Sequence, residues 1–162
     1  MTAEHIPARP PRIAVCGAGI CGEELMGVAE SVGRGIAEAG GVVLCGGHGG
    51  VMEGAARGAT AAGGLTIGIL ATVDPEGANP YIQVPLPTGM GDGRNILVVR
   101  GAQAVIAIGG EWGTLSEVAL ARKVGVPTVL LRPGLTRGLN LPVAEDAEAA
   151  VRWALDAVES PR

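Results

Sequence analysis

Aromatic side chains are nearly absent from this 162-residue chain: phenylalanine does not occur, and aromatic residues together make up 2%. A hydrophobic core must therefore be built from Val, Ile, Leu and Ala, and with 48% hydrophobic residues the chain is not disordered. The length is typical of one domain with a sizeable core. We expect residues 12–162 to form that single domain and residues 1–11, which are polar and Pro-rich, to be a flexible tail.

Lysine and histidine are also scarce. Lys123 is the only lysine, and it does not follow the glycines of a Walker phosphate loop, so that motif is excluded. Lys123 also lies near the C-terminal end of an expected helix, away from the glycine-rich turns, which argues against a Schiff base with pyridoxal phosphate. The two histidines, His5 and His48, are far apart in the sequence, and no metal site is expected.

The chain also lacks an excess of basic charge, a long apolar run and paired cysteines, and each absence disfavours a class of partner or a location. The net charge of −4 gives no sign of the basic face that binds nucleic acid polymers. No apolar run reaches the roughly 18 residues of a membrane span. The three cysteines, Cys16, Cys21 and Cys45, are odd in number and form no C-x-x-C pair, which is typical of reduced thiols in a cytoplasmic protein.

Apolar strand-like runs alternate with helix-like segments along the chain. The expected strands are 12–16, 42–45, 65–70, 81–85, 104–108 and 127–131, and the expected helices are 23–39, 50–62, part of 89–101, 113–124 and 145–158. Most of these strands are continuously apolar, which is typical of parallel strands covered by helices on both faces. We predict a doubly wound, mainly parallel, Rossmann-like α/β fold that binds ligands at the carboxyl ends of its strands.

The first of three glycine-rich turns, residues 17–22, has the pattern G-x-G-x-x-G between a strand and a helix. A dinucleotide site would also need an acidic residue at the end of the second strand, but that strand ends in Cys45-Gly46-Gly47, and NAD(P) is not expected. Gly17 and Gly19 are therefore either phosphate-binding residues or parts of a tight turn without a ligand.

The second turn holds four glycines directly before a helix: Gly46, Gly47, Gly49 and Gly50. Structural packing alone could explain two of them, whereas four favour a backbone cradle for an anion. His48, in the middle of this turn, either bonds a phosphate or points to water.

The third turn, residues 109–117, also joins a strand to a helix and is the most informative stretch of the chain. Its Gly110, Gly113 and Thr114 are candidate phosphate ligands, because backbone N–H groups at a helix N-terminus attract anions. Glu117 lies one turn into the helix, where it either faces the same pocket or interacts with the helix dipole. Trp112 either stacks on a ligand ring or packs at an interface or loop.

A basic residue with suitable chemistry follows another glycine-rich loop. Arg94 begins an expected helix after Met90-Gly91-Asp92-Gly93, and its planar fork suits phosphate better than a lysine would. The alternative is a solvated surface arginine. Its neighbour Asn95 can cap a helix or bond the edge of a ligand.

These motifs together resemble the LOG, or lysine-decarboxylase-like, superfamily (SLOG) over roughly residues 12–132. Cytokinin-activating members cleave the base from a nucleoside 5′-monophosphate, and the resemblance implies that Arg94 and Glu117 correspond to their catalytic arginine and glutamate. Three positions depart from that pattern: Asn95 replaces a lysine, Gly109 a proline, and Glu111 a glycine. The local sequences around Arg94 and Trp112 are similar to those of the molybdenum cofactor carrier-like branch, which includes small bacterial proteins.

Two functions follow from these observations. The first is a binding protein, a carrier or sensor, for a phosphorylated ring-bearing molecule such as a nucleotide or the molybdenum cofactor as cargo. The second is a nucleoside 5′-monophosphate phosphoribohydrolase, in which Glu117 stabilises the positive ribose or activates water while Arg94 anchors the phosphate, with no cofactor required. The resemblance also implies a homodimer or homotetramer, and the small-residue helices at 50–62 and 115–124 could pack between subunits.

Overall fold

The computed structural model describes residues 7–160, so most of the expected tail, residues 1–6, lies outside the described residues. Seven parallel strands form one sheet in the order β4-β3-β2-β1-β5-β6-β7. The strands are β1 (Arg12–Gly17), β2 (Val42–Cys45), β3 (Leu65–Leu70), β4 (Val84–Pro87), β5 (Ala104–Ile108), β6 (Thr128–Leu131) and β7 (Val143–Ala144). The α-helices are α1 (Glu23–Glu38), α2 (Val51–Ala61), α3 (Asn95–Gly101), α4 (Trp112–Val124) and α5 (Ala147–Glu159).

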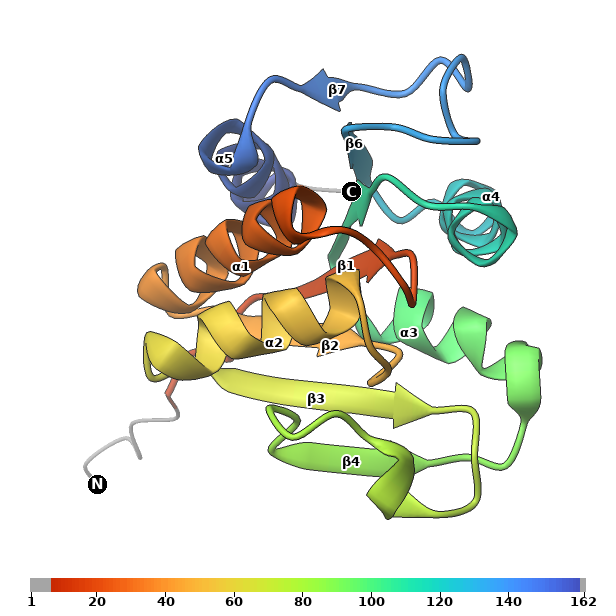
Figure 1. The fold of residues 1–162 in the computed structure, drawn as a ribbon. Coiled ribbons are helices and arrows are strands. Elements are labelled where there is room, and N and C mark those ends of the chain that lie inside the picture. The colour runs from red at the N-terminus through yellow and green to blue at the C-terminus, as the bar shows by residue number, and fades with distance from the viewer. Residues whose placement is uncertain (1–6, 161–162) are drawn as a thin grey trace, which may run out of the picture.

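Helices cover both faces of this sheet (Figure 1). On one face, α1, α2 and α5 enclose a cluster that includes Ile13, Val43 and Ile106. On the other face, α3 and α4 cover the alternate side chains, such as Ala14, Leu44 and Val105. Because successive residues of a strand point to opposite faces, both sets are buried and the strands read as continuous apolar runs. The predicted doubly wound Rossmann-like fold is confirmed, with every strand parallel.

Glycine follows α1 and α4, close to the positions where these two helices were expected to end. Gly40, just past α1, has φ 76°, and Gly125, which caps α4, has φ 76° in the left-handed region. A residue with a Cβ adopts that conformation at a cost, so these glycines allow the chain to turn back toward the sheet. In residues 7–160, no helix combines the length and hydrophobicity that a membrane crossing needs.

Two strands differ from the expectation. The strand expected at 81–85 lies instead at Val84–Pro87, because Tyr81 is held in a turn: its N–H donates to Asn79 Oδ1 at 3.0 Å, and its carbonyl accepts from Thr66 Oγ1 at 2.6 Å. The two prolines of β4 are tolerated because this strand is at the edge of the sheet. The short β7 was not expected, since two residues carry too little periodicity to recognise.

Two glycines of α2 pack closely against α1 of the same chain. A Cβ at Gly58 would lie 1.9 Å from the carbonyl oxygen of Glu30, and one at Gly54 would lie 2.8 Å from that of Met26. Gly33 of α1 is equally close to α2, because a Cβ at this position would lie 1.9 Å from the Ala55 carbonyl oxygen. Gly54 and Gly58 are therefore used for packing within the chain, and packing of the helix at 50–62 between subunits stays a prediction.

Two glycines of α1 provide a matched test of this packing. Gly33→Ala should destabilise the protein by about 1–3 kcal/mol, because its methyl group collides with backbone that cannot move away freely. Gly27→Ala should stabilise it by about 0.5–1 kcal/mol, because nothing lies within 4 Å of the new Cβ and alanine favours the helix. Urea unfolding of both variants measures the difference, and equal stabilities would contradict the packing described here.

Candidate functional site

The candidate site lies where the direction of the fold reverses. From β1 the chain continues through α1 on one face of the sheet, and from β5, the neighbour of β1, it continues through α4 on the other face. The two connections diverge and leave a crevice at the carboxyl ends of these strands, which is where doubly wound proteins bind ligands. Gly17 ends β1 and lies opposite Ile108, which ends β5.

A pocket of about 670 Å³ opens in this crevice. It brings together eight of the predicted site residues from three separate segments: Gly17, Gly19, Arg94, Asn95, Trp112, Gly113, Thr114 and Glu117. Ala18, Ile20, Met52, Asp92 and Glu111 complete its lining. The volume is in the range that holds a nucleotide-sized molecule.

Five predicted ligand glycines do not line this pocket: Gly46, Gly47, Gly49, Gly50 and Gly110. Close packing accounts for at least three of them, because an added Cβ would lie 2.4 Å from an Arg94 nitrogen at Gly46, 2.1 Å from the Ala18 carbonyl oxygen at Gly50, and 2.3 Å from Thr114 at Gly110. The turn at 46–50 thus lies against Arg94 and the first turn. That these glycines contact a ligand stays a prediction.

His48 also lies outside the pocket lining. Its side chain is half-buried, and burial, followed by the nearby Arg94 charge, lowers the pKa of its imidazole. Its carbonyl accepts a hydrogen bond from Asn79 Nδ2 at 2.8 Å, which ties the second turn to the loop before β4.

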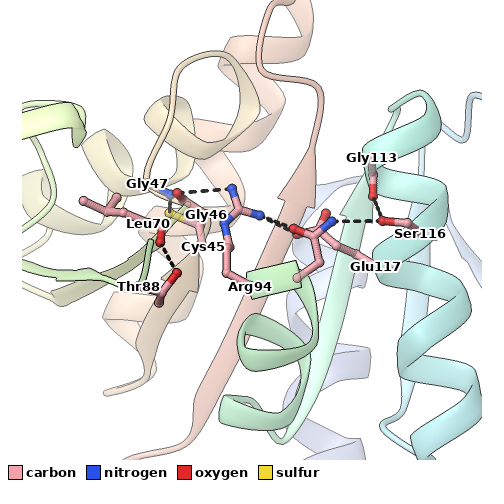
Figure 2. Close-up of polar contacts among 10 residues, drawn as sticks. Cys45, Gly46, Gly47, Leu70, Thr88, Arg94, Gly113, Ser116 and Glu117 are labelled. Carbon is pink, nitrogen blue, oxygen red and sulfur yellow. Dashed lines mark hydrogen bonds and ion pairs between the residues drawn. The ribbon is translucent and has the colours of Figure 1, made fainter. Parts of the chain in front are cut away.

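Arg94, drawn in Figure 2, is the basic side chain of the pocket. It is only 8% exposed. It donates from one terminal nitrogen to Asn95 Oδ1 and from the other to the Gly46 carbonyl over a long 3.4 Å. Its Nε is buried without a hydrogen-bond partner among residues 7–160. A guanidinium has five N–H donors, so Arg94 keeps donor capacity for a ligand in the pocket.

Asn95 and Ser116 hold Arg94 in place from the neighbouring helix. Asn95 Nδ2 donates to Ser116 Oγ at 2.9 Å. Ser116 Oγ donates in turn to the Gly113 carbonyl at 2.7 Å (Figure 2). This series joins the first turns of α3 and α4. Because Asn95 uses both ends of its amide inside the protein, its contribution to the site is the position of Arg94.

Glu117 lies beside Arg94 in the floor of the pocket. The nearest oxygen of its carboxyl group is 3.9 Å from an Arg94 nitrogen, and the side chain is almost fully buried. Burial raises the pKa of Glu117 to about 7, although the Arg94 charge and a hydrogen bond from Cys16 lower it. The thiol of Cys16 is buried beneath, and burial together with the Glu117 charge raises the pKa of this thiol well above its usual value. A carboxyl group with such a pKa can exchange a proton near neutral pH.

The open side of the pocket carries exposed apolar side chains next to acidic ones. Ile20 is 93% exposed and Trp112 is 75% exposed, although both are large and hydrophobic. Asp92 and Glu111 line the same pocket, and neither carboxylate forms an ion pair within residues 7–160. Exposed apolar groups around a polar cavity are typical of a binding site for a ring.

Sequence reasoning did not name Ser116, Met52, Ile20 or Asp92 as site residues. Ser116 and Asp92 lie inside the motifs that pointed to the site, so their position in the sequence was a usable signal. Ile20 had the same signal, because it lies within the first glycine-rich turn, whereas Met52 gave none, because an apolar side chain at the start of a helix is typical of the core.

Gly19 differs from Gly17, Gly46 and Gly50 because packing does not require it. An added Cβ would meet only the methyl group of Met52, at 3.9 Å, so the space in front of Gly19 belongs to the pocket. We expect Gly19→Val to weaken binding of a nucleoside monophosphate by about tenfold or more, because the new side chain occupies ligand space. Calorimetric titration measures this, with Gly27→Val as a control on open surface. Unchanged affinity in Gly19→Val would show that the ligand does not reach this wall.

Comparison with known proteins relates the chain to proteins of the same fold. A family model described as the SLOG cluster4 family matches residues 10–160, a range that includes the whole pocket lining. An uncharacterized protein of Archaeoglobus fulgidus is 40% identical over 145 residues, which are 89% of this chain and 94% of that protein.

Two solved structures are similar over nearly their whole length. The molybdenum cofactor binding protein of the phototrophic bacterium Rippkaea orientalis is 34% identical, with a TM-score of 0.88 over 94% of this chain and 99% of that chain. The molybdenum cofactor carrier protein of Chlamydomonas reinhardtii is 32% identical, with a TM-score of 0.85 over 94% of this chain and 100% of that chain.

Proposed function

The chain belongs to the SLOG cluster4 family, and on that premise we propose that it binds a phosphorylated, ring-bearing small molecule in the pocket between β1 and β5. The superfamily resemblance and its carrier-like branch are confirmed by the matches above. The observation that carries the proposal is Arg94, a buried guanidinium that lines an open pocket and whose two terminal nitrogens each donate to one protein oxygen, which leaves further N–H groups for a ligand. A buried cation with free donors is suited to a phosphate group.

The state of Glu117 strengthens this assignment of the phosphate to Arg94. With a pKa of about 7, Glu117 is largely neutral in slightly acidic solution and compensates the Arg94 charge only in part near neutrality. An arriving phosphate therefore meets a net positive group rather than a neutral pair. The N-terminus of α4, with Thr114 in its first turn, adds backbone donors at the same place.

The ring of the ligand is assigned to the exposed apolar side of the pocket. Trp112 and Ile20 offer flat and apolar surface there, and stacking on an aromatic face accepts many ring systems. The two solved relatives are named for the molybdenum cofactor, which makes this phosphorylated compound the first candidate for the cargo of a carrier. NAD and pyridoxal phosphate are not part of the proposal, and Lys123, in the last turn of α4, does not line the pocket.

Ligand-induced stabilisation tests the proposal. The melting temperature should rise with nucleoside monophosphates or with molybdenum cofactor and should not change with the corresponding nucleosides, because a ligand that binds only the folded state stabilises it. At a ligand concentration of 100 times Kd, the stabilisation is about 2.7 kcal/mol. No shift across the phosphorylated panel would contradict the proposal.

A specific observation also supports a second function, nucleoside 5′-monophosphate hydrolysis at the N-glycosidic bond. Arg94 and Glu117, which correspond to the catalytic pair of the phosphoribohydrolases, lie 3.9 Å apart in one pocket. In this function the phosphate binds Arg94, and the Glu117 carboxylate stabilises the positive charge on the ribose or activates water.

Base release from AMP and from an N6-prenylated AMP distinguishes the two functions. Release by the natural protein and its loss in Glu117→Gln would establish a hydrolase. Binding without release would leave a carrier or sensor. Release that survives in Glu117→Gln would overturn the catalytic role given to this residue.

A further inference from the structure

We propose that Glu111 reads the donor edge of the ligand ring, and that this edge carries a ring N–H next to an exocyclic amino group, as guanine and pterins do. The inference rests on the proposed function, since it names the class of ring that accompanies the phosphate at Arg94. It concerns the Glu111 carboxylate, which lies on the exposed side of the pocket and has no part in binding the phosphate at Arg94.

The charges of the pocket are arranged in two parts. Arg94 is the only basic side chain among the lining residues and is buried, whereas Asp92 and Glu111 are exposed carboxylates. A ligand with several phosphate groups would bring further negative charge against these carboxylates, which is unfavourable. A molecule with one phosphate at Arg94 and hydrogen-bond donors at its other end matches both parts.

Glu111 is the carboxylate best placed for the ring. It directly precedes Trp112, and both line the pocket. It occupies the N-cap position of α4, but its side chain makes no capping hydrogen bond and no ion pair in the described structure. Its acceptor oxygens are therefore available to a ligand.

The chemistry of the carboxylate selects the edge. An ionised carboxylate accepts hydrogen bonds and donates none, and its two oxygens can accept two parallel bonds from adjacent N–H groups. A 2-amino-4-oxopyrimidine edge presents that pair of donors. The corresponding edge of adenine presents a ring acceptor, which a carboxylate repels.

The test uses nucleotides that differ in one group. GMP should bind at least about tenfold more tightly than IMP, which lacks only the 2-amino group, because a lost hydrogen bond to a charged acceptor has about that effect. In Glu111→Gln the ratio of the GMP affinity to the IMP affinity should fall to nearly one. Glu145→Gln is the matched control: it removes the same charge from an exposed residue outside the pocket lining, and the preference for GMP over IMP should persist in it.

Binding of a phosphorylated pterin tests which ring system the site prefers. 6-Hydroxymethylpterin monophosphate carries the same donor pair, so we expect it to bind and to lose affinity in Glu111→Gln, and its affinity relative to GMP shows which ring the site prefers. Equal binding of GMP and IMP by the natural protein, or a preference that survives in Glu111→Gln, would overturn this inference while the proposed function stands. If none of the phosphorylated probes binds, the proposed function itself fails.

Discussion

Arg94→Ala is expected to weaken binding of a nucleoside monophosphate by about a hundredfold or more, because the variant loses a charged donor that can hold phosphate through two hydrogen bonds. The loss of affinity should concern only the contribution of the phosphate group. Affinity for the corresponding nucleoside, already weak, should not change. Arg94→Lys should bind with intermediate affinity, since it keeps the charge but lacks the planar fork. Calorimetric titration of the three proteins with GMP measures the effect.

The control for this variant is Arg100→Ala. Arg100 lies on α3, the helix that directly follows Arg94, is exposed, and does not line the pocket, so its removal changes the net charge equally without touching the site. The fold should survive in Arg94→Ala, because Glu117 takes up a proton when it loses its partner and no buried charge is left uncompensated. Equal affinities of the Arg94 and Arg100 variants would show that the phosphate binds elsewhere.

Glu117→Gln should remove a pH dependence from the stability of the protein. Burial raises the pKa of Glu117 from 4.5 to about 7 in the folded state, so the folded protein holds this proton more tightly than the unfolded chain does. The resulting stabilisation is fully present below about pH 4.5 and is lost as the pH rises through about 7. A shift of this size corresponds to about 3 kcal/mol.

The free energy of unfolding, measured in urea from pH 4.5 to 8, tests this linkage. The stability of the natural protein relative to Glu117→Gln should fall by about 3 kcal/mol over that range, because glutamine resembles the neutral carboxyl group and does not titrate. Glu145→Gln, which replaces an exposed carboxylate outside the helices, should leave the slope unchanged. Parallel curves for the natural protein and Glu117→Gln would show that Glu117 is not the buried acid inferred here.

The elements of the fold were largely predictable because their signals are local. Continuous apolar runs such as 104–108 can be buried only when both faces of a sheet are covered, and glycines mark where the helices stop. The expected strand at 81–85 was misplaced because the turn at Tyr81 depends on hydrogen bonds from Thr60 and Thr66, which are distant in the sequence.

The candidate site was predictable as a set of turns but not as a geometry. A glycine-rich turn has the same sequence pattern whether its glycines face a ligand or another part of the backbone. Gly19 faces the pocket with free space before it, whereas Gly46 and Gly50 lie against Arg94 and Ala18. Which of these applies depends on contacts between segments about thirty or more residues apart, and no local pattern records them.

The sequence by itself determined the parallel α/β architecture, because the apolar runs and glycine-rich turns that predict it are local. Its resemblance to a known superfamily indicated the family and singled out Arg94 and Glu117 as candidate site residues. Only the tertiary structure decided that Arg94 is buried with a free Nε, that Asn95 and Ser116 brace it, and that Glu117 is buried deeply enough to hold a proton near pH 7. Burial and electrostatic coupling arise from packing between α3, α4 and the strand ends, so they exist only after the chain has folded.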